Sequence, residues 1–228
     1  MLAFQFLSLA VQPTSNFFSG NPQDPLATKG VAFYDPNSNG GSMLDNAGDG
    51  YGEPLNVIIS ALSSPAVLTD AGLLNFAQAI GFSFECLHQH LGAPQSANLG
   101  DGNGWVNQTV ELRWDFGSSE IGTCLESLVG GNHFRVFRQN GTQANSGALF
   151  LAVSQEEDVE EGHTIIQNGY NVGRDSMVAA ATGNTKHNGV SYHTTAQNIT
   201  GLLAPGSEGV NHGVAQDGIT TLLTVTIL

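Results

Sequence analysis

Residues 148–153 read ALFLAV, and this unbroken apolar run constrains the fold more than any other segment. Successive side chains of a strand point to opposite faces, so a strand that is apolar throughout must be covered on both sides. The segment 132–139, NHFRVFRQ, precedes it, and the turn-forming letters NGTQANSG lie between the two. We therefore predict a hairpin whose second strand, within 148–155, is central in a sheet.

The segment before this hairpin predicts a strand followed by a helix. Residues 54–62, PLNVIISAL, are typical of a buried strand. In residues 69–82, apolar side chains recur at helical spacing, Thr69 offers an N-cap oxygen, and Gly81 can end the helix.

The segment after the hairpin repeats this pattern and then returns to strands. Residues 171–183 predict a second helix, with Asn171 as N-cap and Gly183 at its end. Residues 189–203 and 220–228 are rich in Thr, Val, Ile and Leu, which favours two closing strands.

The order of elements predicts an α+β fold. We expect a two-layer α/β sandwich with a mixed or antiparallel sheet, two main helices and long loops, built around a split βαβ core. Residues 1–53 would form an extended arm and loops, because they are rich in Pro, Gly, Asn and Asp. Residues 54–228 would form one domain, and residues 83–128 an insertion within it.

The charge balance excludes whole classes of partner. The 228 residues carry only six Lys plus Arg and a net charge of −14. Binding to nucleic acid, or to anionic lipid, requires a basic patch, which six scattered cations do not provide. Only 11% of residues are charged, against about a quarter in typical soluble domains. Solubility through Asn, Ser, Thr, Gln and Gly is common in extracellular proteins, so we expect secretion and no membrane span.

Cysteines and glycosylation sequons also bear on whether the protein is secreted. Cys86 and Cys124 enclose a loop of about 38 residues, which a disulfide would close in an oxidising compartment and two thiols would leave open in the cytosol. Three N-glycosylation sequons begin at Asn107, Asn140 and Asn198, a number that chance alone would produce. The N-terminal apolar run MLAFQFLSLAV fits either a clipped signal peptide or a first strand.

The first strand of the hairpin concentrates scarce polar groups. Alternation places His133 and Arg135 on one face, and a buried Arg135 needs an anionic partner. One interpretation pairs Arg135 with Asp175 or with a carboxylate of the acidic stretch EEDVEEG. The other is a pocket in which His133 and His163 act as acid and base while Arg135 and Arg174 hold an anion.

Other motifs are weaker, and we expect neither a cofactor nor a metal. His88 and His90 have the spacing of half a metal site, but the sequence shows no third ligand. Residues 45–53 and 100–104 resemble calcium loops and are interpreted as Gly-rich turns. No nucleophile elbow, zinc-protease, phosphate-loop or dinucleotide motif is present. Glycoside hydrolysis needs a pair of carboxylates. Four acids could supply such a pair, but their spacing does not distinguish them from ordinary loop acids: Glu111, Asp115, Glu120 and Glu126.

Three segments together resemble a known family. They read GEPLNVIISALSSPAVLTDAGLLNFAQAIGF, NHFRVFR and GHTIIQNGYNVGRD, in that order. They are similar to the LssY C-terminal domain family, which in bacteria is often attached to membrane phosphatases of the phosphatidic acid phosphatase type. The stretch NQTVELRWDFGSSEIGTCLESLVGGNHFRVFRQNG also resembles secreted, uncharacterised proteins of filamentous fungi.

The resemblance spans roughly residues 53 to 183 and implies a fold and a pocket. It names no substrate, because the family has no established activity to carry over. Phe137 stands where the family has Trp, and the acidic stretch and both cysteines depart from the bacterial pattern. The family's polar positions correspond to His133, Arg135, Arg138, His163, Arg174 and Asp175.

Three functions remain open at this point. The first is a secreted, possibly glycosylated, non-catalytic interaction or cell-wall-associated domain. The second is binding or hydrolysis of a small anion or phosphoester by the His/Arg cluster. The third is a carbohydrate-binding module, which would need exposed aromatic side chains such as Trp105 and Trp114.

Overall fold

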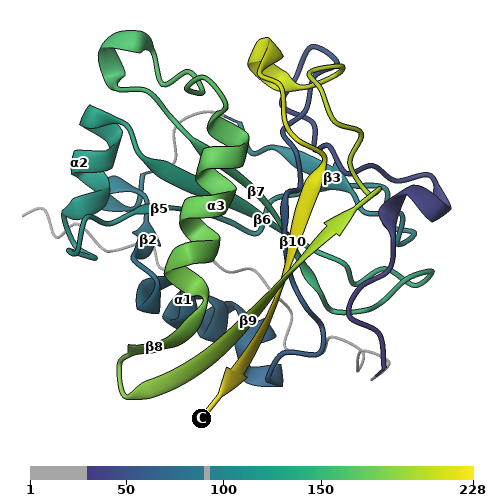
Figure 1. Cartoon of the computed structure of the whole chain (residues 1–228), viewed down its shortest axis with the longest axis horizontal. Helices are drawn as coiled ribbons and strands as arrows, with labels where there is room; N and C mark the ends of the chain where they lie inside the picture. Colours follow the sequence, from purple (N-terminus) through teal and green to yellow (C-terminus); the bar gives the residue numbers. More distant parts are fainter. Residues whose placement is uncertain (1–29, 90–92) are drawn as a thin grey trace, which may run out of the picture.

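An eight-stranded sheet forms the centre of the molecule in the computed structural model, which describes residues 30–89 and 93–228 (Figure 1). β1 (Val57–Ile59) pairs with β10 (Ile219–Ile227) in parallel, and every other neighbouring pair in this sheet is antiparallel. β3 (Ser96–Asn98) and β4 (Trp105–Asn107) form a separate two-stranded sheet. The large sheet runs, in spatial order, β2 (Phe82–Phe84), β5 (Val110–Trp114), β6 (Asn132–Arg138), β7 (Leu149–Gln155), β1 (Val57–Ile59), β10 (Ile219–Ile227), β9 (Val190–Thr200) and β8 (Gly183–His187).

The hairpin predicted from the apolar run is confirmed. β6 and β7 pair antiparallel from Asn132 opposite Gln155 to Arg138 opposite Leu149. β7 lies between β6 and β1, and its residues 149–154 are all buried. A strand in that position has a neighbour along each edge and a covered layer on each face, which is why it is apolar throughout.

The helices confirm the α+β class but differ in number from the prediction. Thr69 caps α1 (Asp70–Ala79) by accepting a hydrogen bond from the Gly72 amide, as expected. α3 (Gly169–Ala181) begins before the predicted start, with Asn168 rather than Asn171 at its N-cap. α2 (Gly122–Val129) is a third helix that the sequence pattern did not indicate, so two main helices are not confirmed among the described residues.

The two faces of the sheet bury different clusters. On one face, Val57, Val136 and Leu151 pack with α1 and α3, including Phe76 and Met177. Figure 1 shows α3 crossing this face. On the opposite face, the apolar side chains pack instead against the segment that leads into β1: Met43 and Leu55 meet Ile58, Phe137, Phe150 and Ala152. Each face thus has its own apolar core.

Several 3₁₀ turns join these elements, and the first of them belongs to the N-terminal arm predicted for residues 1–53. Residues 30–53 include one turn and short bridges to β3 and to Pro54. Residues 1–29, with the apolar N-terminal run, lie outside the described residues. The turns are η1 (Pro36–Asn39), η2 (Pro65–Leu68), η3 (Cys86–His88), η4 (Val159–Glu161) and η5 (Asn211–Gly213).

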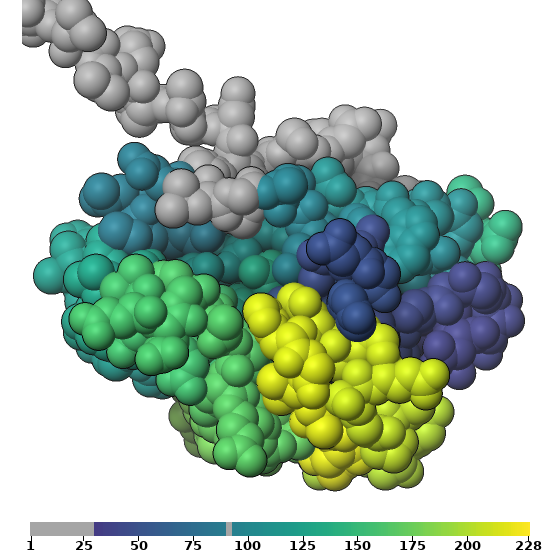
Figure 2. Space-filling view, turned by 90° about the horizontal axis from the view of Figure 1, so that it is seen from above, coloured from purple at the N-terminus to yellow at the C-terminus, as the bar shows by residue number. Residues whose placement is uncertain are grey.

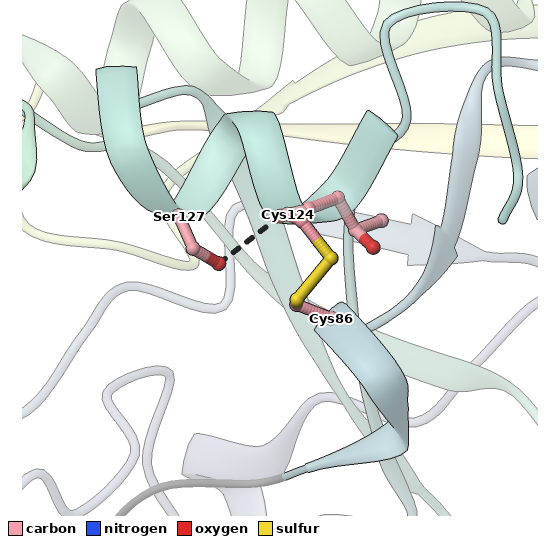
Figure 3. Close-up of a disulfide and its surroundings, with 4 residues drawn as sticks. Cys86, Cys124 and Ser127 are labelled. Carbon is pink, nitrogen blue, oxygen red and sulfur yellow. Dashed lines mark hydrogen bonds between the residues drawn. A yellow bond between two sulfur atoms is a disulfide. The ribbon is translucent and has the colours of Figure 1, made fainter. Parts of the chain in front are cut away.

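A disulfide joins Cys86 of η3 to Cys124 of α2, with their Cα atoms 4.5 Å apart (Figure 3). The loop that it closes corresponds, in the chain-entropy description, to roughly 4 kcal/mol of stabilisation. The segment expected as an insertion, 83–128, contains α2 and also supplies β5 of the large sheet. No helix within residues 30–89 and 93–228 has the length and apolarity needed to cross a bilayer.

Candidate functional site

A patch of polar side chains continues the second face of the sheet beyond its apolar part. Glu111 of β5 lies opposite Arg135 of β6, and Arg113 lies opposite His133. His133 in turn lies opposite Ser154 of β7. Because side chains at every second position share a face, these five point to the same side of three adjacent strands. Four further acids adjoin them. We call the resulting nine residues the acidic cluster: Asp45, Glu53, Glu111, Arg113, Glu126, His133, Arg135, Ser154 and Glu156.

Arg135 is held by two carboxylates. Its Nη1 donates to Glu53 Oε2 at 2.9 Å, and its Nε lies 3.1 Å from Glu111 Oε2. Burial opposes ionisation, but Glu53 and Glu111 outweigh it and raise the pKa of Arg135. Of the two partners proposed from the sequence, Asp175 was wrong, because it pairs with Arg174 instead. The acidic stretch contributes Glu156, which helps to raise the pKa of Arg135, but the direct ion pairs come from Glu53 and Glu111.

Arg113 is the second cation of the acidic cluster and contacts more carboxylates than Arg135. Its Nη2 donates to Glu111 Oε1 at 2.8 Å. Its Nη1 donates to Glu156 Oε2 at 2.9 Å and to Glu126 Oε2 at 3.1 Å. Glu126 comes from α2, and Glu156, the first residue of the acidic stretch, directly follows β7. Arg113 therefore ties α2 and the end of β7 to β5.

His133 is completely buried beside these ion pairs. Its Nε2 lies 3.1 Å from Arg135 Nη1 and 3.2 Å from Ser154 Oγ, whereas its Nδ1 has no hydrogen-bond partner. Nδ1 is 3.5 Å from Glu156 Oε1. Burial, followed by Arg135 and Arg113, lowers the pKa of His133 well below its usual value. The imidazole is therefore neutral near pH 7.

His163 approaches the same carboxylate from the loop that follows β7. Its Nδ1 is 3.5 Å from Glu156 Oε2 and has no hydrogen-bond partner, and its side chain is 35% exposed. That loop is the green protrusion at the top of Figure 1, and it belongs to the green part of the surface in Figure 2. The structure thus brings His133 and His163, two residues singled out in the sequence, to either oxygen of Glu156.

Arg174 does not join them. Its guanidinium pairs with Asp217 at 2.6 and 2.8 Å and with Asp175 at 2.8 Å. Arg174 belongs to α3, which covers the face of the sheet opposite to that of His133 and Arg135. The expectation that Arg135 and Arg174 hold one anion together is therefore wrong, because the sheet separates them.

Arg138 lies on the same face of the sheet as α1. It donates to Asp70 Oδ1 at 2.9 Å and to the carbonyl of Leu68. Each of the four arginines, all within the described residues, is consequently paired with a carboxylate.

Acids outnumber cations in the acidic cluster. Five buried carboxyl groups, from Asp45, Glu53, Glu111, Glu126 and Glu156, surround two guanidinium groups. Burial raises the pKa of Glu126 to about 7, and burial together with Glu53 raises that of Asp45 to about 8. Burial also raises the pKa of Glu156. Near neutral pH, protons therefore supply part of the missing positive charge.

A pocket of about 190 Å³ adjoins the acidic cluster at Glu111. Glu111 both lines this pocket and contacts Arg113 and Arg135, so a ligand would meet carboxylates before it reached a guanidinium. Its lining is Phe84, Glu85, His88, Pro94, Gln108, Thr109, Val110 and Glu111.

The remaining sequence motifs have structural roles or fall outside the description. His88 lies in η3 with its ring 5.1 Å from that of Phe84, and His90 is not among the described residues. Asp45 accepts a hydrogen bond from the Glu53 amide, and Asp101 accepts one from the Gly141 amide, so both Gly-rich segments use a carboxylate to hold backbone.

Sequence reasoning missed Arg113 and Glu156 as central residues. Glu111 and Arg113 occupy alternate positions of a strand, VELRW, as His133 and Arg135 do. This alternation of charged residues in both segments could have predicted that the two strands pair and that their charged faces lie side by side.

Comparison with protein-family models, curated proteins and solved structures found no match for this chain. The similarity to the LssY C-terminal domain family therefore stays a prediction.

Proposed function

We propose that this chain is a secreted, non-catalytic domain that binds an extracellular protein through α2. The observation that carries the proposal is an exposed apolar helix face. Ile121, at the helix N-cap, and Leu125, Leu128 and Val129 are all exposed, and the first three occur at the i, i+4, i+7 spacing of one face. Leu87, which adjoins the disulfide to α2, is 71% exposed.

Such a surface favours a protein partner over a sugar. Clustered large apolar side chains on a soluble domain are typical of interaction sites. Sugar-binding surfaces rely on aromatic rings, whereas this face is aliphatic. The disulfide is compatible with secretion, and it would also hold η3 and α2 together as one rigid surface.

The alternative of anion or phosphoester binding receives less support. An arginine that binds a phosphate must offer donors to it, and the four arginines already donate to carboxylates. A phosphate entering the acidic cluster would also meet five carboxyl groups in a low-dielectric environment.

The test compares the wild-type chain with Leu125→Glu/Leu128→Glu as immobilised baits for the secreted proteins of the cells that make it. Leu62→Glu, whose leucine is 56% exposed in the turn between β1 and η2, is the matched control. We expect to capture a protein that binds the wild type and Leu62→Glu but not the double variant. Once this partner is purified, its affinities for the three proteins should follow the same order.

A thermal-shift series with phosphate, phosphoesters and oligosaccharides tests the other functions directly. A saturable rise in melting temperature with a phosphoester or a sugar, together with equal partner binding by all three proteins, would contradict the proposal.

A further inference from the structure

Three buried side chains of the acidic cluster converge at one place, where Arg113 accounts for the two carboxylates but not for the unpartnered Nδ1 of His133. Glu126 from α2, His133 from β6 and Glu156 after β7 each place one potential ligand atom within 4.8 Å of the other two. Two of the three, Glu126 and His133, are completely buried. Among the residues that the structure describes, this is the one such group of histidine, cysteine and acid side chains.

The distances around His133 suit a shared cation better than a hydrogen bond. Nδ1 is buried, has no hydrogen-bond partner, and lies 3.5 Å from Glu156 Oε1. Hydrogen bonds between nitrogen and oxygen are about 2.7–3.2 Å long. Two ligands each about 2.0–2.1 Å from a tetrahedral zinc ion lie roughly 3.3 Å apart. A small inward movement of either side chain would complete such a pair.

Charge favours a cation at the same place. Around Arg113, three carboxyl groups share one guanidinium, from Glu111, Glu126 and Glu156. His133 is neutral and adds no charge. A dication bound by Glu126 and Glu156 would balance this excess of negative charge.

We propose that Glu126, His133 and Glu156 bind one divalent transition-metal ion, with Zn²⁺ as the best fit. One imidazole nitrogen and two carboxylate oxygens form a ligand set that zinc accepts. Ca²⁺ and Mg²⁺ prefer oxygen ligands throughout, so the imidazole selects against them. The ion would link α2 to the centre of the sheet, next to the proposed interaction face, but the inference does not depend on that function.

The surrounding contacts allow this binding with two adjustments. When Nδ1 binds the metal, the imidazole proton resides on Nε2, which can donate a hydrogen bond to Ser154 Oγ at 3.2 Å. Arg135 Nη1 then gives up its contact with Nε2 and keeps the one with Glu53. Arg113 retains Glu126 and Glu156, because each carboxylate oxygen has two lone pairs.

His163 provides a candidate fourth ligand whose side chain is partly exposed to solvent. Its Nδ1 lies 3.5 Å from Glu156 Oε2, whereas His133 lies near Oε1, and it has no hydrogen-bond partner. Its loop extends beyond the N-terminal end of α3 at the top of Figure 1. A rotation of this half-exposed side chain would complete a tetrahedral site, and a water molecule would do so otherwise.

The experiment uses the full chain without an affinity tag, stripped with a chelator that is then removed. Titration with ZnCl₂ by calorimetry is expected to show one site per chain, with a melting temperature that rises with Zn²⁺ but not with Ca²⁺ or Mg²⁺. His133→Gln and Glu126→Gln should weaken binding roughly 100-fold or more, and His163→Gln by a smaller factor. His193→Gln, at an exposed histidine on β9, is the matched control and should bind like the wild type.

X-ray absorption of the zinc-loaded wild type decides the case even if a buried variant does not fold. We expect only nitrogen and oxygen ligands at about 2.0–2.1 Å, with one or two imidazoles. Absence of saturable Zn²⁺ binding, or equal affinity in His193→Gln, Glu126→Gln and His163→Gln, would overturn the site.

Discussion

Arg113 and Glu156 form a 2.9 Å ion pair across 43 residues of the chain. The pair joins β5 to the residue that follows β7, with β6 between them. Because Glu156 also lies 3.5 Å from His133 and from His163, this one carboxylate connects both histidines to the arginine. The acidic cluster is thus a single electrostatic unit, and its members should respond together to substitution.

Arg113→Met tests this directly. It would leave three buried carboxyl groups without their shared cation, so we expect the free energy of unfolding to fall by about 3–5 kcal/mol. Chemical denaturation at pH 7 measures the change. Arg138→Met removes a less buried pair with Asp70 and serves as the comparison. An equal or larger loss in Arg138→Met would contradict the central role of Arg113.

Asp45 should make stability depend on pH. Burial and Glu53 raise its pKa from 3.8 to about 8, so between these values the folded state holds a proton that the unfolded state has released. The free energy of unfolding therefore decreases as the pH rises through this window, by up to about 1.4 kcal/mol per pH unit from this group.

Asp45→Asn isolates that contribution, because an amide oxygen can still accept the hydrogen bond from the Glu53 amide. We expect the variant to gain stability relative to the wild type as the pH is raised from 5 to 8. Denaturation curves at several pH values give the difference. If the difference in the free energy of unfolding between wild type and variant stays constant with pH, Asp45 ionises normally.

The disulfide should matter most for α2. Cys86→Ser/Cys124→Ser is expected to lower the free energy of unfolding by about 3–4 kcal/mol, since the 38-residue loop is no longer closed in the unfolded state. Hydrogen exchange should show the largest loss of protection in α2. A reducing agent should destabilise the wild type and leave the double variant unchanged; sensitivity of both would point to another cause.

The two arginine sites should behave independently. Arg135 and Arg174 lie on opposite sides of the sheet, so the effects of Arg135→Gln and Arg174→Gln should add within about 0.5 kcal/mol. Arg135→Gln and Glu111→Gln should instead show coupling of about 0.5–3 kcal/mol, because those side chains touch. Strong coupling between Arg135 and Arg174 would instead support the interpretation that both hold one anion.

Local patterns in the sequence determined much of the fold. The apolar run 148–153 predicted the central strand, and Thr69 predicted the start of α1, because alternation and capping depend only on neighbouring residues. α2 escaped prediction because its eight residues are few and its apolar side chains face solvent rather than a core.

For the candidate site, the sequence by itself determined that His133 and Arg135 share a face and that Arg135 requires an anion. Only the tertiary structure decided which anions those are. The order of strands placed Glu111 beside Arg135. The packing of α3 on the other face of the sheet kept Arg174 and Asp175 away from Arg135. Strand alternation has a period of two residues and can be read locally, whereas strand order and helix side depend on how distant segments bury their apolar faces.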